Sequence, residues 1–247
     1  HYPLRRQRQM CIRDSFGINC WEMVAGGSLG GMQALQWAIS YPERIKKAAI
    51  IAASSKISTQ NIALNEVARE IIKKDEHFHN GDYLAMDQSP MKGLKAARML
   101  GHITYLSAKN MDKRFGRKLQ NIDSKIAENV NFEIENYLQY KGGKFAESFD
   151  ANSYILLTKV MDKFDIAHGY DECLEVALEN IDAEVLVVSF TSDWMFPTSN
   201  GKEICLASIK ANKKCSYIEL EGEHGHDSFL YPNEDYQNAI KNFIESK

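Results

Sequence analysis

Apolar residues gather in short runs near the two ends of the chain, and glycine-rich turns and amphipathic stretches separate them. The first run, NCWEMVA at residues 19–25, leads directly into a glycine-rich turn at residues 26–31. This pattern predicts a buried strand that enters a tight turn. A helix is predicted at residues 32–40, ending before Pro42, and a second buried strand at residues 47–53. Strand, helix and strand within about 35 residues indicate a βαβ unit and therefore a parallel sheet.

The middle of the chain follows a different pattern. Residues 56–180 are rich in Lys, Glu, Asn and Met and lack strand signals. Amphipathic helical spacing is clearest at residues 61–74 and 90–106. We interpret this segment as a helical insertion that caps the sheet.

The alternation of strands and helices resumes after the insertion. Strands are predicted at residues 184–190 and 215–220, and helices at residues 199–210 and 233–245. The expected organisation is an α/β core formed by residues 15–55 and 181–247, with the cap at residues 56–180 between its two halves.

Composition narrows the class of protein. The chain has 247 residues, a formal net charge of −3 and 44% hydrophobic residues, which predicts one large domain or one domain with an insertion. This charge favours neither nucleic acid nor an anionic membrane as a partner, and no apolar run is long enough to cross a bilayer. A His-Gly-His at residues 224–226 lacks a third ligand nearby, so no metal site is predicted. The cysteines are scattered without metal-ligand spacing, which favours free thiols and a cytoplasmic location; they are Cys11, Cys20, Cys173, Cys205 and Cys215.

The first fourteen residues stand apart from the rest. They read HYPLRRQRQMCIRD, with four arginines close together. No apolar stretch follows the arginines, so the segment is not a signal peptide. A basic arm for nucleic acid is one alternative, but we interpret residues 1–14 as a non-native stretch and leave them out of the fold.

The glycine-rich turn contains a candidate nucleophile. Residues 26–30 match G-x-S-x-G with Ser28 at the centre, between a predicted strand and a predicted helix. In a nucleophile elbow, the serine has a strained backbone and needs small neighbours, and the helix N-terminus favours an oxyanion. The backbone amide of Leu29 would be one oxyanion donor. A plain glycine-rich turn between strand and helix is the alternative.

A serine nucleophile needs a base, and the base needs an acid to orient it. Elbow-type enzymes place them in the chain order Ser, Asp or Glu, His. Asp193 follows the predicted strand at residues 184–190, and catalytic groups collect at the carboxyl ends of parallel strands. An ordinary loop aspartate is the alternative. His224 and His226 both follow the last predicted strand, and on chemistry alone either is a candidate base.

Together these motifs resemble the homoserine O-acetyltransferase family, which has the α/β-hydrolase fold. The resemblance covers nearly all of the chain after residue 15, in the family's order. The matching stretches are VAGGSLGGMQALQWAISYPERI around Ser28, LKAARMLGHITYLS around Arg98, FDANSYILLTKVMDKFD around Asn152, SFTSDWMFP around Asp193 and GHDSFL around His226.

The resemblance implies a mechanism. Ser28 would take an acetyl group from acetyl-CoA, a substrate, and pass it to the hydroxyl of L-homoserine in methionine biosynthesis. His226 would be the base and Asp193 its orienting acid. No bound cofactor is implied. A homodimer through the cap helices is expected.

The resemblance also implies an amino-acid pocket lined by Arg98, Tyr105 and Asp227. An arginine can bind a substrate carboxylate in a bidentate fork, and an aspartate can bind the ammonium. Taken singly, Arg98 reads as a helix-surface residue, Tyr105 as a core residue and Asp227 as a cap or turn residue.

The chain departs from the family at its start. Family members begin with further strands and a loop that carries a second oxyanion donor, and nothing in this sequence matches that region. We therefore expect a fragment whose sheet lacks its first strands. Four alternatives remain open: a homoserine O-succinyltransferase, a serine O-acyltransferase, a capped serine esterase, and a non-catalytic fragment that only binds a partner.

Overall fold

The computed structural model describes residues 11–12, 14–119, 132–231 and 233–246. Its sheet is parallel throughout, with the strands side by side in chain order. The strands are β1 (Trp21–Gly27), β2 (Ile45–Ile51), β3 (Glu184–Phe190) and β4 (Cys215–Leu220). The predicted parallel α/β sheet is confirmed. Most of the stretch at residues 1–14 lies outside the described residues.

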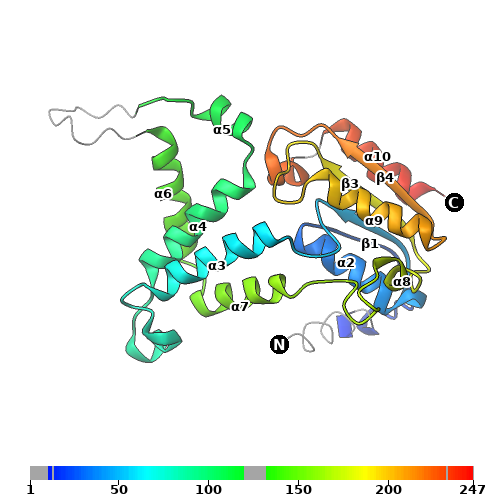
Figure 1. The fold of residues 1–247 in the computed structure, drawn as a ribbon, viewed down its shortest axis with the longest axis horizontal. Helices are drawn as coiled ribbons and strands as arrows, with labels where there is room; N and C mark the ends of the chain where they lie inside the picture. The colour runs from blue at the N-terminus through cyan, green and yellow to red at the C-terminus, as the bar shows by residue number, and fades with distance from the viewer. Residues whose placement is uncertain (1–10, 13, 120–131, 232, 247) are drawn as a thin grey trace.

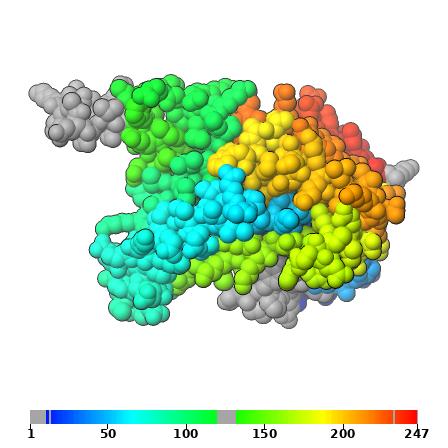
Figure 2. All heavy atoms as spheres, in the orientation of Figure 1, coloured from blue at the N-terminus to red at the C-terminus, as the bar shows by residue number. Residues whose placement is uncertain are grey.

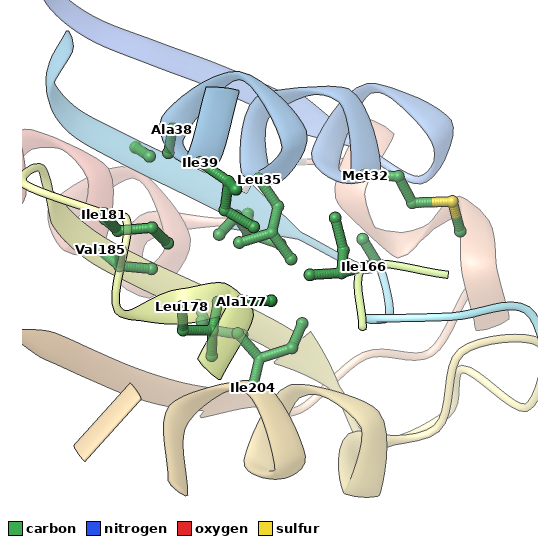
Figure 3. Close-up of a cluster of buried hydrophobic side chains, with 14 of the residues drawn as sticks. Met32, Leu35, Ala38, Ile39, Ile166, Ala177, Leu178, Ile181, Val185 and Ile204 are labelled. Atoms are coloured by element: carbon green, nitrogen blue, oxygen red, sulfur yellow. The ribbon is translucent and has the colours of Figure 1, made fainter. Parts of the chain in front are cut away.

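The inner strands β2 and β3 are apolar on both faces because helices cover both sides of the sheet. Ala48 and Ile50 of β2 pack on one side with α2 (Leu29–Ser40) and α9 (Thr198–Lys210). Figure 3 shows this cluster, in which Leu35 and Ile39 of α2 point toward Leu178 and Ile204. The alternate residues Ala49 and Ile51 pack on the other side, toward α10 (Glu234–Glu245).

The turn at the nucleophile is tighter than the sequence predicts. β1 continues through Gly27, and α2 begins at Leu29, three residues earlier than expected. A single residue, Ser28, makes the turn between them. The glycines of the motif therefore belong to regular structure, where they allow close packing.

The cap consists of helices with an apolar cluster of their own, which includes Ile72, Leu94 and Ala97. The predicted helices at residues 61–74 and 90–106 are confirmed as α3 and α4. Figures 1 and 2 show the cap as a lobe beside the sheet, with α3 reaching toward the core. Its α-helices are α3 (Thr59–Lys73), α4 (Met91–Tyr105), α5 (Ala108–Arg114), α6 (Glu133–Ala146) and α7 (Ala151–Asp162).

The end of the predicted insertion packs differently from the rest of it. Ile166 and the short helix α8 (Leu174–Leu178) join the core cluster beneath α2 and α9. The apolar side chains of α8 complete the cover of the sheet, so this stretch belongs to the core layer by its contacts.

All five cysteines are free thiols. Within the ranges that the structure describes, no helix has the length and apolar character needed to span a membrane.

Lys47 fixes the last helix to the sheet, and its replacement is expected to destabilise the fold. Its buried ammonium donates to the carbonyl oxygens of Phe243 and Ile244, both at 2.9 Å, and of Ser246 at 2.5 Å. Lys47→Met would leave these helix-end acceptors without their cation and should lower the free energy of unfolding by about 2–3 kcal/mol. Urea denaturation measures this. Lys46→Met is the matched control, because Lys46 is exposed and its one hydrogen-bond partner among the described residues is surface Glu22. Equal urea midpoints for both variants would contradict the expectation.

Candidate active site

Ser28 stands at the carboxyl end of β1 with a strained backbone. Its φ of 56° and ψ of −125° lie where non-glycine residues are rare. Two backbone hydrogen bonds hold it there: its amide donates to Ile51 at 2.9 Å, and its carbonyl accepts from Met32 at 3.1 Å. The conformation presents the hydroxyl at the N-terminus of α2, where the amide of Leu29 opens the helix and has no intrahelical acceptor.

The glycines beside Ser28 have unequal roles. A Cβ on Gly26 would lie 2.2 Å from the backbone carbonyl carbon of Gly30, and a Cβ on Gly31 would lie 2.8 Å from the side-chain Cβ of Ala53. A Cβ on Gly30 would meet nothing within 4 Å. The strand and helix can therefore approach each other only because Gly26 and Gly31 lack side chains.

Three residues from distant parts of the chain form a hydrogen-bonded line. His226 Nε2 lies 2.8 Å from Ser28 Oγ, and His226 Nδ1 lies 2.8 Å from Asp193 Oδ2. His226 is 4% exposed and Asp193 is 3% exposed. The structure thus brings together the three residues that the sequence singles out, in the arrangement of a Ser-His-Asp triad.

The acid of this line is well supported. Asp193 Oδ1 accepts hydrogen bonds from the backbone amides of Met195 and Phe196, both at 2.9 Å. These bonds fix the carboxylate so that its other oxygen faces His226. The imidazole is enclosed by the rings of Phe196 and Phe229, whose centroids lie 5.2 and 5.4 Å away.

The second histidine has other partners. His224 Nδ1 lies 3.0 Å from Asn110 Nδ2 in the cap, and its ring lies 4.5 Å from that of Tyr231. Of the two histidines, His226 is the one hydrogen-bonded to both Ser28 and Asp193. The geometry therefore favours His226 as the base, a choice that the sequence chemistry leaves open.

Arg98 lies in α4 with a guanidinium that has few partners. Nη1 donates to the Tyr105 hydroxyl at 3.3 Å, and the guanidinium sits over the rings of Tyr105 and Phe145. Its Nε is buried without a hydrogen-bond partner, and no described carboxylate forms an ion pair with it within 4 Å. A buried, unpaired donor on a cation is a place for an anionic ligand.

Asp227 follows the candidate base in the short helix η4 (Gly225–Leu230) and is half-buried. Burial raises the pKa of its carboxyl, while Coulombic interactions with His226 and Arg98 act in the opposite direction. No ion pair joins it to a described cation within 4 Å. Tyr105 contacts the Arg98 guanidinium, and its ring lies 6.3 Å from that of His226. The three predicted pocket residues thus gather around the candidate base.

Sequence reasoning missed His102, which lies on the same face of α4. Its ring lies 5.7 Å from those of both Tyr105 and Tyr137. Burial, helped by Arg98 and Lys141, lowers the pKa of His102 to about 4, so it stays neutral at physiological pH. His102 lies four residues after Arg98 and three before Tyr105. Residues with this spacing share one face of a helix, and that signal could have identified His102 from the sequence.

Replacing Asp227 with Asn is expected to weaken recognition of an ammonium without unfolding the protein. For the amino-acid acceptor that the sequence resemblance implies, KM should rise about tenfold or more, the size of a charge-assisted hydrogen bond, with a smaller change in kcat. Because only the ionised form attracts an ammonium, parent kcat/KM should fall as the pH falls through the raised pKa of Asp227. In Asp227→Asn, kcat/KM should no longer fall over this pH range. Steady-state kinetics against pH tests this, and an unchanged KM would contradict it.

The substitution should not destabilise the fold. Because ionising a half-buried carboxyl opposes folding, the free energy of unfolding of Asp227→Asn at pH 7 should not be lower than that of the parent.

Comparison with known proteins places this geometry in a family. The family model described as alpha/beta hydrolase fold matches residues 6–231. A homoserine O-succinyltransferase of Cellvibrio japonicus is 47% identical over 252 residues, covering 99% of this chain and 66% of that protein. The chain therefore spans just under two thirds of the length of that curated relative.

Solved structures agree on the fold. Homoserine O-acetyltransferase from Bacillus anthracis superposes with a TM-score of 0.86 at 24% identity, over 98% of this chain and 64% of that one. Esterase E22 superposes with a TM-score of 0.83 at 24% identity, over 97% and 65%. At such identities the likeness concerns the fold alone. Since the family model covers most of the residues and the sheet, elbow and helices agree with it, the chain belongs to the α/β-hydrolase-fold family.

Proposed function

We propose that the chain carries the acyl-transfer site of a homoserine O-acyltransferase. The observation that carries this proposal is the pair of unpaired charged groups beside the candidate triad. Arg98 offers a guanidinium to a carboxylate, and Asp227 offers a carboxylate to an ammonium. A free amino acid presents both groups, and its hydroxyl would then lie near Ser28. The 47% identical relative bears the name of a homoserine acyltransferase, which supports the same acceptor.

In the first half-reaction Ser28 accepts the acyl group. Its Oγ forms an ester bond to the acyl carbon as the thioester bond of the acyl-CoA breaks. His226 takes the hydroxyl proton through Nε2 and gives it to the departing sulfur of CoA. Asp193 holds the imidazole and stabilises its positive charge. The amide of Leu29 is one donor to the oxyanion that forms between these events.

In the second half-reaction the acyl group moves to the acceptor. The homoserine hydroxyl gives its proton to His226 as its oxygen bonds to the acyl carbon, and Ser28 leaves with that proton. Water competes at a concentration roughly four orders of magnitude higher, so transfer needs an advantage of more than about 5 kcal/mol. Two charge-assisted contacts of about 1.5–3 kcal/mol each, through Arg98 and Asp227, together with orientation of the hydroxyl, are of that size.

The acyl donor is the finer part of the proposal. The sequence resemblance implies acetyl-CoA, whereas the curated relative with 47% identity is named a succinyltransferase. That name belongs to a much closer relative in sequence than the acetyltransferase of known structure, at 24% identity. We therefore propose succinyl-CoA as the preferred donor, with acetyl-CoA as the alternative to be tested beside it.

We also keep the oligomeric state and the cellular location as proposals. The homodimer through cap helices and the cytoplasmic location follow from the resemblance and the cysteine pattern. Size-exclusion chromatography with light scattering would test the first. A monomer at micromolar concentration would remove the dimer from the proposal.

The acyl-enzyme is the direct test of the reaction. The protein is incubated with succinyl-CoA or acetyl-CoA without an acceptor, and intact mass spectrometry reads the covalent adduct. The proposal expects one succinyl group on the parent protein, none on Ser28→Ala, and loss of the adduct when L-homoserine is added. An adduct that disappears equally fast with and without homoserine would point to a hydrolase, and an adduct on Ser28→Ala would exclude Ser28 as the nucleophile.

A further inference from the structure

The chain turns sharply between helices α4 and α5 in the cap, and we call residues 105–107 the α4–α5 corner. Leu106 and Ser107 are 3% and 6% exposed, although they join two helices of the cap. Loops that join helices usually run over the surface. Burial of this corner therefore indicates that something beyond the cap packs against it.

One side of the corner contacts the loop that carries Asp193, residues 191–197, which we call the acid loop. The indole Nε1 of Trp194 donates to the carbonyl oxygen of Leu106 at 3.1 Å. Trp194 directly follows Asp193 in the chain. A hydrogen bond to the cap thus lies directly beside the acid, and a second one joins the same loop to the cap where Asn61 Nδ2 of α3 donates to the carbonyl oxygen of Met195 at 3.0 Å.

The other side of the corner contacts the loop that carries His226, residues 221–227, which we call the base loop. Ser107 Oγ donates to the carbonyl oxygen of Glu223 at 2.6 Å. Gly225 has a φ of 68°, and a Cβ there would lie 2.5 Å from the backbone nitrogen of Ser107. The backbones of the cap and the base loop therefore touch one residue before His226.

The two loops also meet directly, since the Gly225 amide donates to Ser192 Oγ at 3.0 Å. The corner adds a third body that hydrogen-bonds to both. We propose that the α4–α5 corner is a splint that holds the acid and base loops in register, with Trp194 and Ser107 as positioning residues. The cap then helps assemble the triad in addition to covering it. This inference rests on the proposed serine chemistry for its kinetic consequence and on the contacts alone for its structural one.

Two substitutions each remove one contact between the corner and a loop, and Ser107→Gly also removes the bond that Ser107 Oγ accepts from the Asn110 amide as the N-cap of α5. Trp194→Phe keeps an aromatic ring and deletes the N–H that Leu106 accepts. Ser107→Gly deletes the hydroxyl, and glycine remains an acceptable residue at the start of α5, so the helix loses little. Asn65→Ala is the matched control, because Asn65 donates to Asp162 within the cap at 2.7 Å and, among the described residues, no hydrogen bond joins its side chain to either loop.

Hydrogen–deuterium exchange tests the splint without requiring activity. The splint predicts that Trp194→Phe, which alters the acid loop, also speeds exchange of the His224 amide in the base loop, which donates to Ser228 Oγ and not to the acid loop. Ser107→Gly should likewise speed exchange of the Met195 and Phe196 amides that hold Asp193. Asn65→Ala should change neither loop. Effects confined to the substituted loop, or no effects, would overturn the proposal.

The rate at which an organophosphonate labels Ser28 gives the catalytic readout, independent of any acyl donor or acceptor. Each positioning variant should be labelled about five- to tenfold more slowly, the size of one net hydrogen bond. The double variant should be slowed by less than the product of the two factors, because both act on one alignment. Labelling within twofold of the parent, with a lowered Tm, would reduce the corner to ordinary packing. An unlabelled parent would count against the triad, and hydrogen exchange would still decide on the splint.

Discussion

Asp193→Asn is expected to lower kcat for acyl transfer on the order of 10⁴-fold while leaving the fold intact. The reason is the number of acceptor atoms. Asp193 uses one oxygen for the amides of Met195 and Phe196 and the other for His226. Asparagine has one oxygen, and keeping both amide bonds turns its NH₂ group toward His226 Nδ1. The imidazole must then accept at Nδ1 and carry its proton on Nε2, where it cannot take the proton of Ser28.

Steady-state kinetics and circular dichroism of the purified variant test this result. Asp227→Asn is the matched control, since it makes the same chemical change one residue beyond the base and is expected to act mainly on KM. A kcat within tenfold of the parent for Asp193→Asn would show that Asp193 does not set the tautomer of His226.

Gly26→Ala is expected to lower the free energy of unfolding on the order of 3 kcal/mol or more and to abolish reaction at Ser28. Its Cβ would lie 2.2 Å from the backbone carbon and 2.3 Å from the carbonyl oxygen of Gly30. Backbone atoms cannot rotate away as a side chain can. Strand β1 and helix α2 would have to separate at the point where Ser28 is held in its strained conformation. A change of that size is a large part of the stability of an ordinary domain.

Gly30→Ala is the contrasting substitution in the same motif. Nothing lies within 4 Å of its Cβ position, and Gly30 has ordinary helical geometry in the first turn of α2. Alanine there should leave stability unchanged or raise it by up to about 1 kcal/mol. Urea unfolding of both variants measures the difference, and similar midpoints would show that the elbow is not limited by the approach of Gly26 to Gly30.

Much of the fold and the triad could be predicted from local patterns. Apolar runs located every strand of the described sheet, and the placement of Ser28, Asp193 and His226 after strand ends predicted that they meet, because carboxyl ends of parallel strands share one edge. The predicted ends of β1 and α2 were less accurate. The glycines at residues 26–31 predict a turn, whereas in the structure most of them lie in the strand and the helix and allow these to pack closely.

Other features depend on distant contacts that no local pattern contains. Ser107 and Glu223 are 116 positions apart in the chain, and neither residue type suggests a partner. The choice between His224 and His226 needed the same kind of information, because both follow β4 and only their hydrogen bonds differ. Arg98 read alone as a surface residue, and its buried, unpaired Nε is visible only once α4 is packed beside the aromatic rings.

Release of CoA thiol by the purified chain, with succinyl-CoA or acetyl-CoA and with or without L-homoserine, tests the central claim most directly. The account predicts release that requires both Ser28 and homoserine and is faster with succinyl-CoA, with Arg98→Met and Asp227→Asn raising the KM for homoserine. Release that is equally fast without homoserine, or that persists in Ser28→Ala, would contradict it.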